Sequence, residues 1–404
     1  MRVLMINTVS GYGSTGSICV DIASVLEEKG HECYIAYGQG TTTYSKSFKI
    51  GTVLENHLHN IGSRLLGKQG YFTKSGTKKL VEFIIEYNPD IIHLHNLHGN
   101  YLNIEILFEF LASYTGSVVW TLHDCWAFTG KCAHYTDVQC FKWQTQCEKC
   151  PQVNKYPTSL FLDQSDIMYS DKKKWFNSIK NLTIIPVSNW LTNEVKKSFL
   201  KNHPIVNIYN WVNHSTFIND NEDIKERYGI AKNKFIILGV SAGWNLSNNR
   251  LKDFIALSKI ISKDMQIVLV GKAATKNDIP SSIIHIPYVD NANELAKLYS
   301  NSDVYVHLST EDTFGKVIAE AMSCGTPAIV YNSTACPEIV GEGCGYVVEK
   351  RDINGIIEKI QIIKNQGKIS YSLKCRSYVL ENFDRITNIN KTIGVYIENA
   401  RNDC

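Results

Sequence analysis

The 404-residue sequence contains no run of 18 consecutive apolar residues, and its start, MRVLMINT, turns polar before an apolar segment of signal-peptide length is complete. These absences predict a chain with neither a membrane-spanning helix nor a secretion signal, and therefore a cytoplasmic protein. Low-complexity segments and internal repeats are also missing. The formal net charge is only +3, which excludes the clustered excess of cations that nucleic-acid binding requires. It leaves open weak binding to an anionic membrane surface, which needs only a local basic patch.

Short apolar segments alternate with helix-period segments along the whole chain. In the first half, strands are expected at residues 2–7, 33–37, 90–94, 117–122 and 182–187. The pattern restarts after residue 210, with strands expected at 234–240, 265–271, 282–289, 302–309 and 326–331. Apolar strands separated by helices form parallel sheets that are covered on both faces. We therefore predict an α/β protein with two successive doubly wound, Rossmann-like domains.

The joint between the two domains is expected within residues 206–217. This gives a first domain at 1–205, with a cysteine-rich insertion at 125–151, and a second domain at 206–386. The last helical segment, 387–404, has no further strand to lead into, so we expect it to pack back on the first domain. Ligands of such sheets bind at the carboxyl ends of the strands, and functional residues are therefore sought there.

The most informative strand end of the second domain leads into the segment EDTFGKVIAEAMSCGTP, residues 311–327. Backbone N–H groups at a helix start near Phe314 and Gly315 would bind hydroxyls or phosphate oxygens. Glu320 lies on that helix and Asp312 before it. A carboxylate accepts two hydrogen bonds from a vicinal diol such as ribose. The alternative is that both carboxylates are solvated charges at a helix end.

This segment, with Pro337-Glu338 after it, resembles the retaining glycosyltransferases of family 4. Members of that family have two Rossmann-like domains facing across a cleft, the GT-B fold. The resemblance covers nearly the entire chain, and it implies a nucleotide-sugar donor, a UDP- or GDP-sugar. Glu320 then corresponds to the residue that holds the nucleotide ribose. The backbone of Phe314, Gly315 and Lys316 corresponds to the loop that grips the donor sugar and phosphate.

The donor diphosphate needs cations, because members of this fold class use basic side chains and helix dipoles instead of a divalent metal. The resemblance therefore implies no cofactor for catalysis. The family's usual Lys-Gly after the strand at 234–240 is missing here, and Arg250 is its nearest substitute. Lys272 is a second candidate, and the alternative for both is an ordinary surface cation. The nucleotide base is expected near the backbone of Val289.

The donor sugar is assigned by the same resemblance to residues of both domains. Either Asp312 or the preceding Glu311 takes the family's sugar-contacting role. In the first domain, His123 ends the strand at 117–122 and matches a family histidine that hydrogen-bonds the donor sugar. The alternative is a structural pair with Asp124. His95, at the end of the neighbouring strand, is expected to line the cleft rather than to bind a metal.

The loop Gly11-Tyr-Gly13-Ser-Thr-Gly16 has the G-x-G-x-x-G spelling of a dinucleotide-binding site. Such a site also needs an acidic residue at the end of the second strand, to bind ribose. That strand here ends CYIAYGQG, without an acid. We therefore interpret the loop, through Gly13 and Gly16, as a wall that touches acceptor and donor sugar-phosphate, and we reject a nicotinamide site.

A cysteine-rich segment follows the strand at 117–122. Its C-x7-C-x6-C-x2-C spacing is formed by Cys132, Cys140, Cys147 and Cys150. In a cytoplasmic protein this spacing favours a structural zinc site. The alternative is a set of reduced thiols that pack a loop with Trp126 and Trp143. The whole stretch closely resembles a subgroup of the family that builds bacterial exopolysaccharide, including colanic acid, capsule and O-antigen.

In this subgroup the acceptor is commonly a polyprenyl-diphosphate-linked oligosaccharide. Residues 57–80 combine five cations, Arg64 among them, with apolar residues such as Leu65, Tyr71 and Phe72. Such a stretch would rest on anionic lipid and place the protein at the inner face of the plasma membrane. The alternative is a solvated helix face with its own core stripe.

The resemblance implies a retaining enzyme that transfers a hexose-type sugar by front-side attack, with catalysis by positioning and by stabilisation of the departing charge. Two rival functions remain. A sugar-nucleotide epimerase shares the fold but needs no acceptor. A catalytically weak binding subunit of a transferase complex would neither hydrolyse nor transfer a nucleotide sugar.

Overall fold

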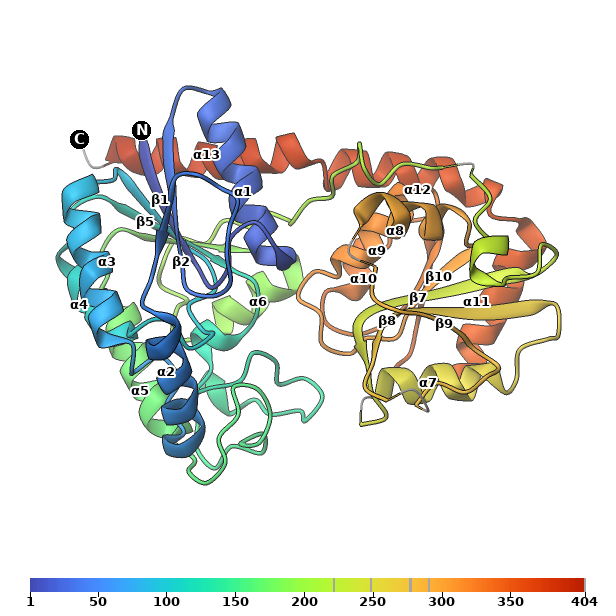
Figure 1. Cartoon of the computed structure of the whole chain (residues 1–404), viewed down its shortest axis with the longest axis horizontal. Helices are drawn as coiled ribbons and strands as arrows, with labels where there is room; N and C mark the ends of the chain where they lie inside the picture. Colours follow the sequence, from blue (N-terminus) through green and yellow to red (C-terminus); the bar gives the residue numbers. More distant parts are fainter. Residues whose placement is uncertain (221, 248, 276–277, 290, 403–404) are drawn as a thin grey trace. The chain divides into compact units, whose positions relative to one another are not determined.

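A computed structural model describes residues 1–220, 222–247, 249–275, 278–289 and 291–402. It divides into two compact units, each with its own six-stranded sheet (Figure 1). Unit 1 comprises Met1–Ile208 and Ile389–Cys404, and unit 2 comprises Tyr209–Asn388. Within the described ranges, no helix is both long enough and apolar enough to cross a membrane.

The sheet of unit 1 has the strand order β3-β2-β1-β4-β5-β6. Its strands, all paired in parallel, are β1 Arg2–Asn7, β2 Glu32–Tyr37, β3 Ser47–Lys49, β4 Ile91–Leu94, β5 Ser117–Leu122 and β6 Leu182–Pro186. The helices between them are α1 Gly13–Glu28, α2 Val53–Leu66, α3 Lys74–Tyr87, α4 Ile104–Ser113, α5 Ser165–Phe176 and α6 Asn189–Lys197. The strand order reverses between β1 and β4, which is the position where doubly wound sheets bind ligands.

The sheet of unit 2 repeats this order as β12-β11-β10-β7-β8-β9, with its reversal between β7 and β10. Its parallel strands are β7 Phe235–Trp244, β8 Met265–Ala273, β9 Ile284–Ile286, β10 Val304–His307, β11 Ala328–Tyr331 and β12 Gly345–Val348. The helices are α7 Asn249–Ser258, α8 Ala292–Ser300, α9 Lys316–Ser323, α10 Cys336–Ile339, α11 Ile353–Gln366 and α12 Ile369–Asn382.

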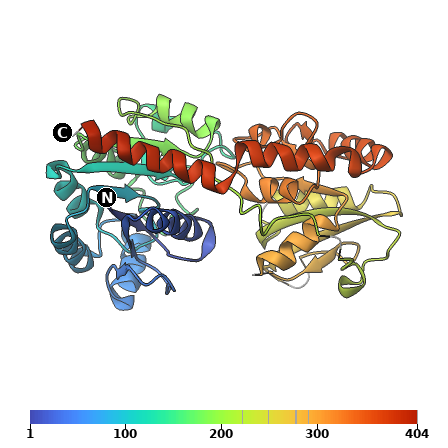
Figure 2. The ribbon, with the colours of Figure 1, turned by 90° about the horizontal axis from the view of Figure 1, so that it is seen from above.

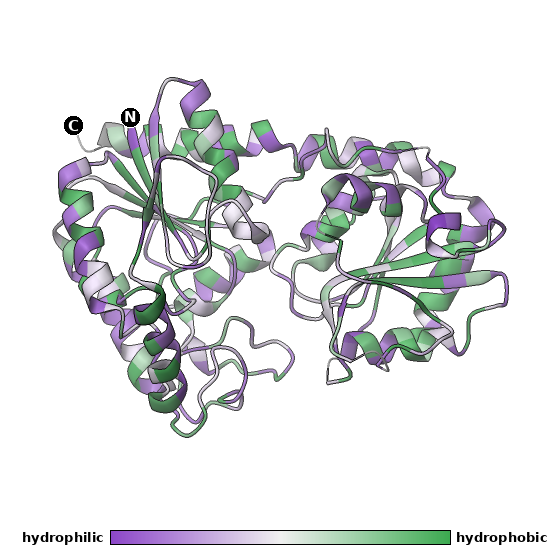
Figure 3. Ribbon diagram, in the orientation of Figure 1, coloured by the Kyte–Doolittle hydropathy of each residue, from purple (hydrophilic) through white to green (hydrophobic). Residues whose placement is uncertain are grey.

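The core of each unit is its sheet. The hydrophobic residues gather on the strands, whereas the helices carry hydrophobic and hydrophilic residues together (Figure 3). In β1, Val3, Leu4, Met5 and Ile6 are fully buried, although successive side chains of a strand point to opposite faces. Both faces of the sheet are therefore covered, as expected for a parallel sheet.

The last helix, α13 Arg385–Asn402, returns to unit 1 (Figure 2). The Tyr396 hydroxyl lies 2.6 Å from Nδ1 of His93 on β4, and Nδ2 of Asn399 donates to Oγ1 of Thr183 on β6 over 3.0 Å. Tyr396 is fully buried. The predicted α/β class, with two Rossmann-like domains and a returning helix, is confirmed.

The structure corrects the predicted strands in detail. The strand β3 was not predicted, because three residues are too short for a clear apolar pattern, and the strand β12 was not predicted either. The apolar run at 282–289 forms only the three-residue strand β9. Conversely, β7 continues past residue 240 to Trp244 through a register shift between Val240 and Gly243. That extension carries β7 to the edge where the candidate site lies.

Candidate functional site

The strand-order reversal of unit 2 is bridged by Arg250, at the start of α7. Its guanidinium donates to Oγ of Ser241 on β7 over 2.9 Å and to Oγ of Ser309, after β10, over 2.6 Å. Ser309 is 2% exposed, so the fork of donors is held in one orientation. A planar guanidinium fixed at a ligand-binding edge is suited to an anionic group such as a phosphate.

Asp312 lies beside this guanidinium. Its carboxylate is 2.5 Å from Nε2 of His307, whose Nδ1 in turn contacts the Tyr305 hydroxyl at 2.9 Å. Burial opposes ionisation of Asp312, but His307 and Arg250 together hold its pKa well below its ordinary value. Asp312 is therefore a fixed anion at neutral pH and a ready acceptor for a ligand hydroxyl.

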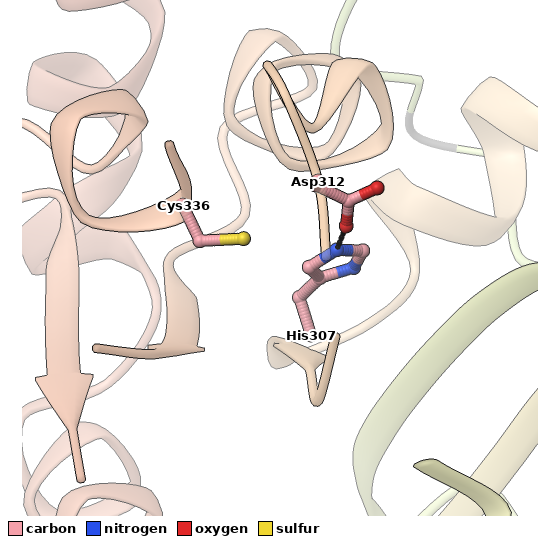
Figure 4. A group of neighbouring side chains, drawn as sticks. All are labelled: His307, Asp312 and Cys336. Atoms are coloured by element: carbon pink, nitrogen blue, oxygen red, sulfur yellow. Dashed lines mark hydrogen bonds and ion pairs between the residues drawn. The ribbon is translucent and has the colours of Figure 1, made fainter. Parts of the chain in front are cut away.

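Cys336 points toward this pair from α10 (Figure 4). Ligand atoms of His307, Asp312 and Cys336 all lie within 4.8 Å of one another, which is close enough to hold a metal ion. Both nitrogens of His307 already have partners, and Arg250 supplies a cation next to Asp312. We therefore interpret the role of this group as orienting the Asp312 carboxylate.

Glu320 lies on α9, and only 7% of its surface is exposed. Burial raises the pKa of Glu320 to about 7, with Lys316 opposing the shift. The Tyr299 hydroxyl donates to its carboxylate over a long 3.4 Å. The Tyr299 ring lies 5.7 Å from the Tyr305 ring, and the Tyr305 hydroxyl is the one that contacts His307. Glu320 and the Asp312–His307 pair are thus connected through two neighbouring tyrosines.

The start of α9 provides the predicted backbone donors. Gly315 is the N-cap of α9 and has a φ of +84°, a left-handed conformation that favours glycine. Phe314 is buried against Tyr209 and Phe383, which anchors the turn. Lys316 begins the helix and is half-buried.

The other predicted residues of unit 2 are more dispersed. Lys272 is exposed near the end of β8, with its ammonium 5.3 Å from the Tyr288 ring. Val289 is half-buried after β9, next to an undescribed residue. The backbone N–H of Glu311 makes a long 3.5 Å contact with Ser309, and its side chain is half-buried. No contact between Lys272 and the Arg250 cluster is seen among the described residues, so its phosphate role stays a prediction.

In unit 1, histidines meet at the carboxyl ends of β4 and β5. Nδ1 of His95 lies 3.1 Å from Nε2 of His123, and the two rings are stacked 5.4 Å apart. His93 and His95 lie on the same face, with ring centroids 4.0 Å apart. Burial lowers the pKa of His123 to about 4, so it is neutral at pH 7. His95 is only 1% exposed and orients His123, whose predicted sugar contact is not tested by this geometry.

Asp124 pairs with a different histidine from the one expected. Its carboxylate is 2.7 Å from Nε2 of His98 and accepts the Trp126 N–H over 2.8 Å. Burial opposes its ionisation, but His98 lowers the pKa of Asp124 to about 2. Nδ1 of His98 contacts the Tyr156 hydroxyl at 2.8 Å. The structural pairing considered for His123 thus belongs mainly to His98.

The glycine loop forms the turn between β1 and α1. Gly11 has a φ of +79° and its N–H donates to the Gly16 carbonyl over 3.1 Å. Gly16 is buried, and a Cβ there would lie 3.0 Å from Val9. Gly13, where α1 begins, is exposed with open space around its missing side chain. Strand β2 ends at Tyr37 without an acidic residue, which agrees with the rejection of a nicotinamide site.

Unit 1 also contains a large open pocket, with a volume of about 910 Å³. Its lining includes the cations Lys49 and Arg64 and the amides Asn56, Asn60 and Asn100. It is bordered by α2, and the prediction from sequence did not include it. The polar residues of α2 are separated by apolar ones, so the sequence reads as an ordinary amphipathic helix.

The four cysteines of the predicted zinc site lie in the irregular segment between β5 and α5. The neighbouring Cys150 and burial raise the pKa of Cys132 well above its ordinary value, while Cys132 lowers the pKa of Cys150 to about 7. No three of these sulfurs are within 4.8 Å of one another, since among the described residues only the His307 group meets that limit.

Sequence reasoning missed Ser241, Ser309 and His307, which orient Arg250 and Asp312. Each lies within or directly after a strand at the carboxyl edge, and this placement was the available signal. Serine is too frequent in loops for the signal to stand out without the spatial pairing.

Two family profiles match the chain. The profile described as Glycosyltransferase Family 4 matches residues 15–216, half of the chain, and the one described as Glycosyl transferases group 1 matches residues 220–378. The chain belongs to glycosyltransferase family 4. The predicted family is thereby confirmed, and so is a glycosyltransferase as the class of enzyme.

Curated relatives of this glycosyltransferase have low identity, and two of the three described here match most of its length. The WcaC protein of Escherichia coli (strain K12), a glycosyl transferase assigned to colanic acid biosynthesis, is 22% identical over 89% of this chain and 90% of its own. The N-acetyl-alpha-D-glucosaminyl L-malate synthase of Bacillus anthracis is 24% identical over 97% of this chain and 95% of its own. An Escherichia coli UDP-Gal:alpha-D-GlcNAc-diphosphoundecaprenol alpha-1,3-galactosyltransferase is 24% identical over 44% of this chain and 49% of its own.

Solved structures share the fold of this glycosyltransferase. Sucrose-phosphate synthase from Thermosynechococcus elongatus has a TM-score of 0.71 at 16% identity, covering 98% of both chains. Anabaena HepE in complex with UDP-glucose has a TM-score of 0.65 at 15% identity, covering 98% of this chain and all of that chain. The glycosyltransferase therefore has the GT-B fold.

Proposed function

We propose that this glycosyltransferase transfers a hexose-type sugar, with retention at the anomeric carbon, from a UDP- or GDP-sugar to a polyprenyl-diphosphate-linked oligosaccharide during synthesis of a bacterial surface polysaccharide. The observation that carries the donor half is the Arg250 fork beside the anionic Asp312 at the strand-order reversal of unit 2. Glu320, connected to the Asp312–His307 pair through Tyr299 and Tyr305, is the ribose ligand. HepE binds UDP-glucose, which supports a donor of this class.

In the proposed reaction, the bond between the anomeric carbon and the diphosphate oxygen breaks, and its electron pair leaves with the diphosphate. The acceptor hydroxyl attacks from the same face, and its proton passes to the departing diphosphate oxygen. Arg250 and the N–H groups at the start of α9 stabilise the charge that develops there. Asp312 accepts a hydrogen bond from a sugar hydroxyl and fixes the ring.

The acceptor half rests on unit 1. The pocket beside α2 combines Lys49 and Arg64 with amides, which suits a diphosphate carrying sugar hydroxyls. A relative acts on a diphosphoundecaprenol-linked substrate, and this supports a lipid-linked acceptor.

A two-step experiment tests this function. Thermal-shift screening of UDP- and GDP-sugars is expected to give one donor that raises the melting temperature by several degrees at a concentration far above its Kd. Incubation of that donor with polyprenyl-diphosphate-linked oligosaccharide should then yield a product with the donor's anomeric configuration, read by NMR. Inversion would contradict the retaining mechanism. Release of free sugar with no need for an acceptor would point to the epimerase instead.

A small hydroxy acid is the second candidate acceptor. It is favoured by the Bacillus anthracis relative, an L-malate synthase that matches 97% of this chain. Transfer to L-malate with no transfer to the lipid-linked acceptor would replace the proposed acceptor and leave the donor site unchanged.

We further propose that α2 holds the enzyme on the inner face of the plasma membrane. Six large apolar side chains of α2 are between 43% and 83% exposed: Val53, Leu54, Leu58, Ile61, Leu65 and Leu66. In Figure 3, α2 carries both hydrophobic and hydrophilic residues. Phe161, 74% exposed, is next to Leu160, whose N–H donates to the Arg64 carbonyl at the end of α2. Exposed apolar residues of this number, with Arg64 and Lys68 beside them, suit an anionic bilayer.

This surface differs from the one predicted for residues 57–80. Tyr71 and Phe72 are half-buried, with the Tyr71 hydroxyl on Asp171 and the Phe72 ring against His59. Their aromatic rings are therefore part of the packing of unit 1, and the exposed apolar residues extend along the whole of α2, including Leu65 and Leu66 of the predicted stretch.

The double variant Leu54→Ser/Leu58→Ser is expected to bind vesicles containing phosphatidylglycerol about 30-fold less than wild type, because each exposed leucine contributes about 1 kcal/mol of apolar burial. Co-sedimentation measures the bound fraction. Ile85→Ser is the matched control, since Ile85 is 64% exposed on α3 of the same unit. Equal loss in the control, or no loss in the double variant, would remove α2 as the membrane contact.

A further inference from the structure

We propose that Asp124 and His98 fix the direction of the hydrogen bond made by the Tyr156 hydroxyl, so that the Tyr156 oxygen binds an O–H group on a sugar of the lipid-linked substrate. Tyr156 is then a specificity-determining residue, and His98 and Asp124 are its positioning residues. Tyr156 lines the large pocket beside α2. The inference therefore rests on the proposed function, which assigns that pocket to the lipid-linked substrate.

The three side chains form a continuous chain of hydrogen bonds within unit 1. Nε2 of His98 lies 2.7 Å from Oδ2 of Asp124, and Nδ1 of the same ring lies 2.8 Å from the Tyr156 hydroxyl. The side chains of His98 and Asp124 are only 12% and 14% exposed, whereas Tyr156 is 52% exposed. The chain of hydrogen bonds thus leads from a largely buried carboxylate to the wall of the pocket.

The direction of each hydrogen bond follows from Asp124. Its other oxygen, Oδ1, accepts the Trp126 N–H over 2.8 Å. Burial opposes ionisation of Asp124, but His98 lowers its pKa to about 2, so both carboxylate oxygens accept. A neutral imidazole has one N–H, and here it must be the Nε2–H, which donates to Asp124. Nδ1 is then a lone pair, and Tyr156 must donate its only proton to it.

The surroundings hold the His98 ring in this orientation. Oγ1 of Thr8 donates to the carbonyls of Asn96 and His98 over 3.0 and 2.5 Å, which fixes the backbone on both sides of Leu97. The His98 ring is in contact with the rings of Trp126 and Tyr156, with centroids 5.6 Å away in each case. A ring packed in this way keeps Nε2 toward Asp124 and Nδ1 toward Tyr156.

The pocket is thereby divided between two kinds of ligand group. The Tyr156 oxygen has only lone pairs to offer, so it attracts an O–H group and repels phosphate oxygens. The cations Lys49 and Arg64 line the same pocket and attract phosphate. The Lys49 ammonium is held by the Gly40 carbonyl at 2.6 Å. A substrate with a diphosphate next to a sugar carries both groups that this pocket selects.

Asp124→Asn is expected to reverse the chain of hydrogen bonds without changing its shape. The amide oxygen of the variant stays with the Trp126 N–H, so its NH₂ group faces Nε2 of His98. Nε2 must then accept, and the proton of the neutral ring moves to Nδ1. The Tyr156 oxygen would receive that N–H, and its own proton would point into the pocket.

Kinetics of the full chain test the substrate contact, with the donor found by thermal shift and the polyprenyl-diphosphate-linked oligosaccharide. Tyr156→Phe should raise the KM for the lipid-linked substrate about tenfold and leave kcat within about twofold, since one neutral hydrogen bond to substrate is lost. Asp124→Asn should raise the same KM about threefold or more. Tyr71→Phe is the matched control, because it removes a hydroxyl that contacts Asp171 at 2.8 Å and does not line the pocket, and its KM should be that of wild type.

Nitrogen-15 NMR of histidine-labelled chain at pH 8 tests the hydrogen-bond direction separately. The His98 signals are identified by their absence from His98→Asn. We expect the Nε2–H tautomer in wild type and the Nδ1–H tautomer in Asp124→Asn. An Nδ1–H tautomer in wild type would overturn the proposal, and so would an unchanged KM in Tyr156→Phe when wild type is active, although the proposed function would stand.

A wild-type chain that transfers nothing to the lipid-linked substrate would instead reject the proposed function, and the substrate contact of Tyr156 with it. The NMR signals of wild type would still decide whether Asp124 and His98 fix the Tyr156 hydroxyl. If Asp124→Asn does not fold, the wild-type tautomer and the KM of Tyr156→Phe decide together.

Discussion

Glu320→Ala is expected to lower kcat/KM for glycosyl transfer by about 100-fold or more, while the protein stays folded. The proposed ribose diol donates two hydrogen bonds to this carboxylate, and hydrogen bonds to a charged group each contribute roughly 1.5–3 kcal/mol. The side chain is 7% exposed, so water does not readily replace it. Steady-state kinetics with the donor found by thermal shift measure the loss.

The control is Glu358→Gln on α11, whose side chain is 65% exposed in its pair with Lys359. That variant should transfer at the wild-type rate. Unchanged turnover in Glu320→Ala would reject the site assignment. A rise in KM with an unchanged kcat, which excess donor would overcome, would limit the role of Glu320 to donor binding.

The same residue makes a prediction for stability in the absence of donor. Burial raises the folded-state pKa of Glu320 to about 7 from an ordinary 4.5. Its contribution to stability is therefore fully present below pH 4.5 and is lost as pH rises through about 7. Glu320→Gln avoids the loss and should be more stable than wild type at pH 8 by up to about 3 kcal/mol. The two melting temperatures, compared at pH 5 and pH 8, should diverge only at the higher pH.

Arg250→Ala is expected to lower kcat by about 100- to 1,000-fold, the range seen when one donor to a developing oxyanion is removed. Its guanidinium contacts both sides of the strand-order reversal through Ser241 and Ser309, which hold its fork of donors in place. Arg250→Lys should recover only part of the rate, because an ammonium cannot contact a diphosphate bidentately.

Lys252→Ala is the matched control for Arg250. Lys252 lies on the same helix, two positions further along, and it is exposed. The two variants remove equal charge from α7, so a rate loss in both would assign the effect to overall charge. Full activity in Arg250→Ala would leave Lys272 as the remaining predicted phosphate ligand.

Much of the fold could be predicted from the sequence, because its strands are buried on both faces. Strands such as β1, which contains the buried Val3 and Ile6, therefore appear in the sequence as continuous apolar runs, and such runs are easily recognised. Short edge strands such as β3 carry too few residues for a pattern, and the three-residue β9 occupies only part of a longer apolar run. Hydrogen bonding to a neighbouring strand determines where these edge strands begin and end. That pairing cannot be inferred from the sequence alone.

The candidate site could be predicted where its residues form a local sequence motif. It could not be predicted where the fold brings together residues that are distant in the sequence. Glu320 and Gly315 are five residues apart on one loop and helix, so they belong to one local motif, and the resemblance of that motif to family 4 indicated a ligand-binding helix start. The contact of Arg250 with Ser309 joins residues 59 positions apart, and the pairing of Asp124 with His98 joins residues 26 positions apart. Such partners follow from the sheet topology, which brings separate strand ends to one edge.

The return of α13 has a consequence for synthesis on the ribosome. The buried His93 of β4 receives its Tyr396 partner from 303 residues later in the chain. Unit 1 begins to emerge first and yet is completed last, after all of unit 2 has been translated. A polypeptide released after residue 208 would lack α13 and would expose the surface of unit 1 that α13 covers. Cellular quality control would therefore encounter such chains with an incompletely folded unit 1.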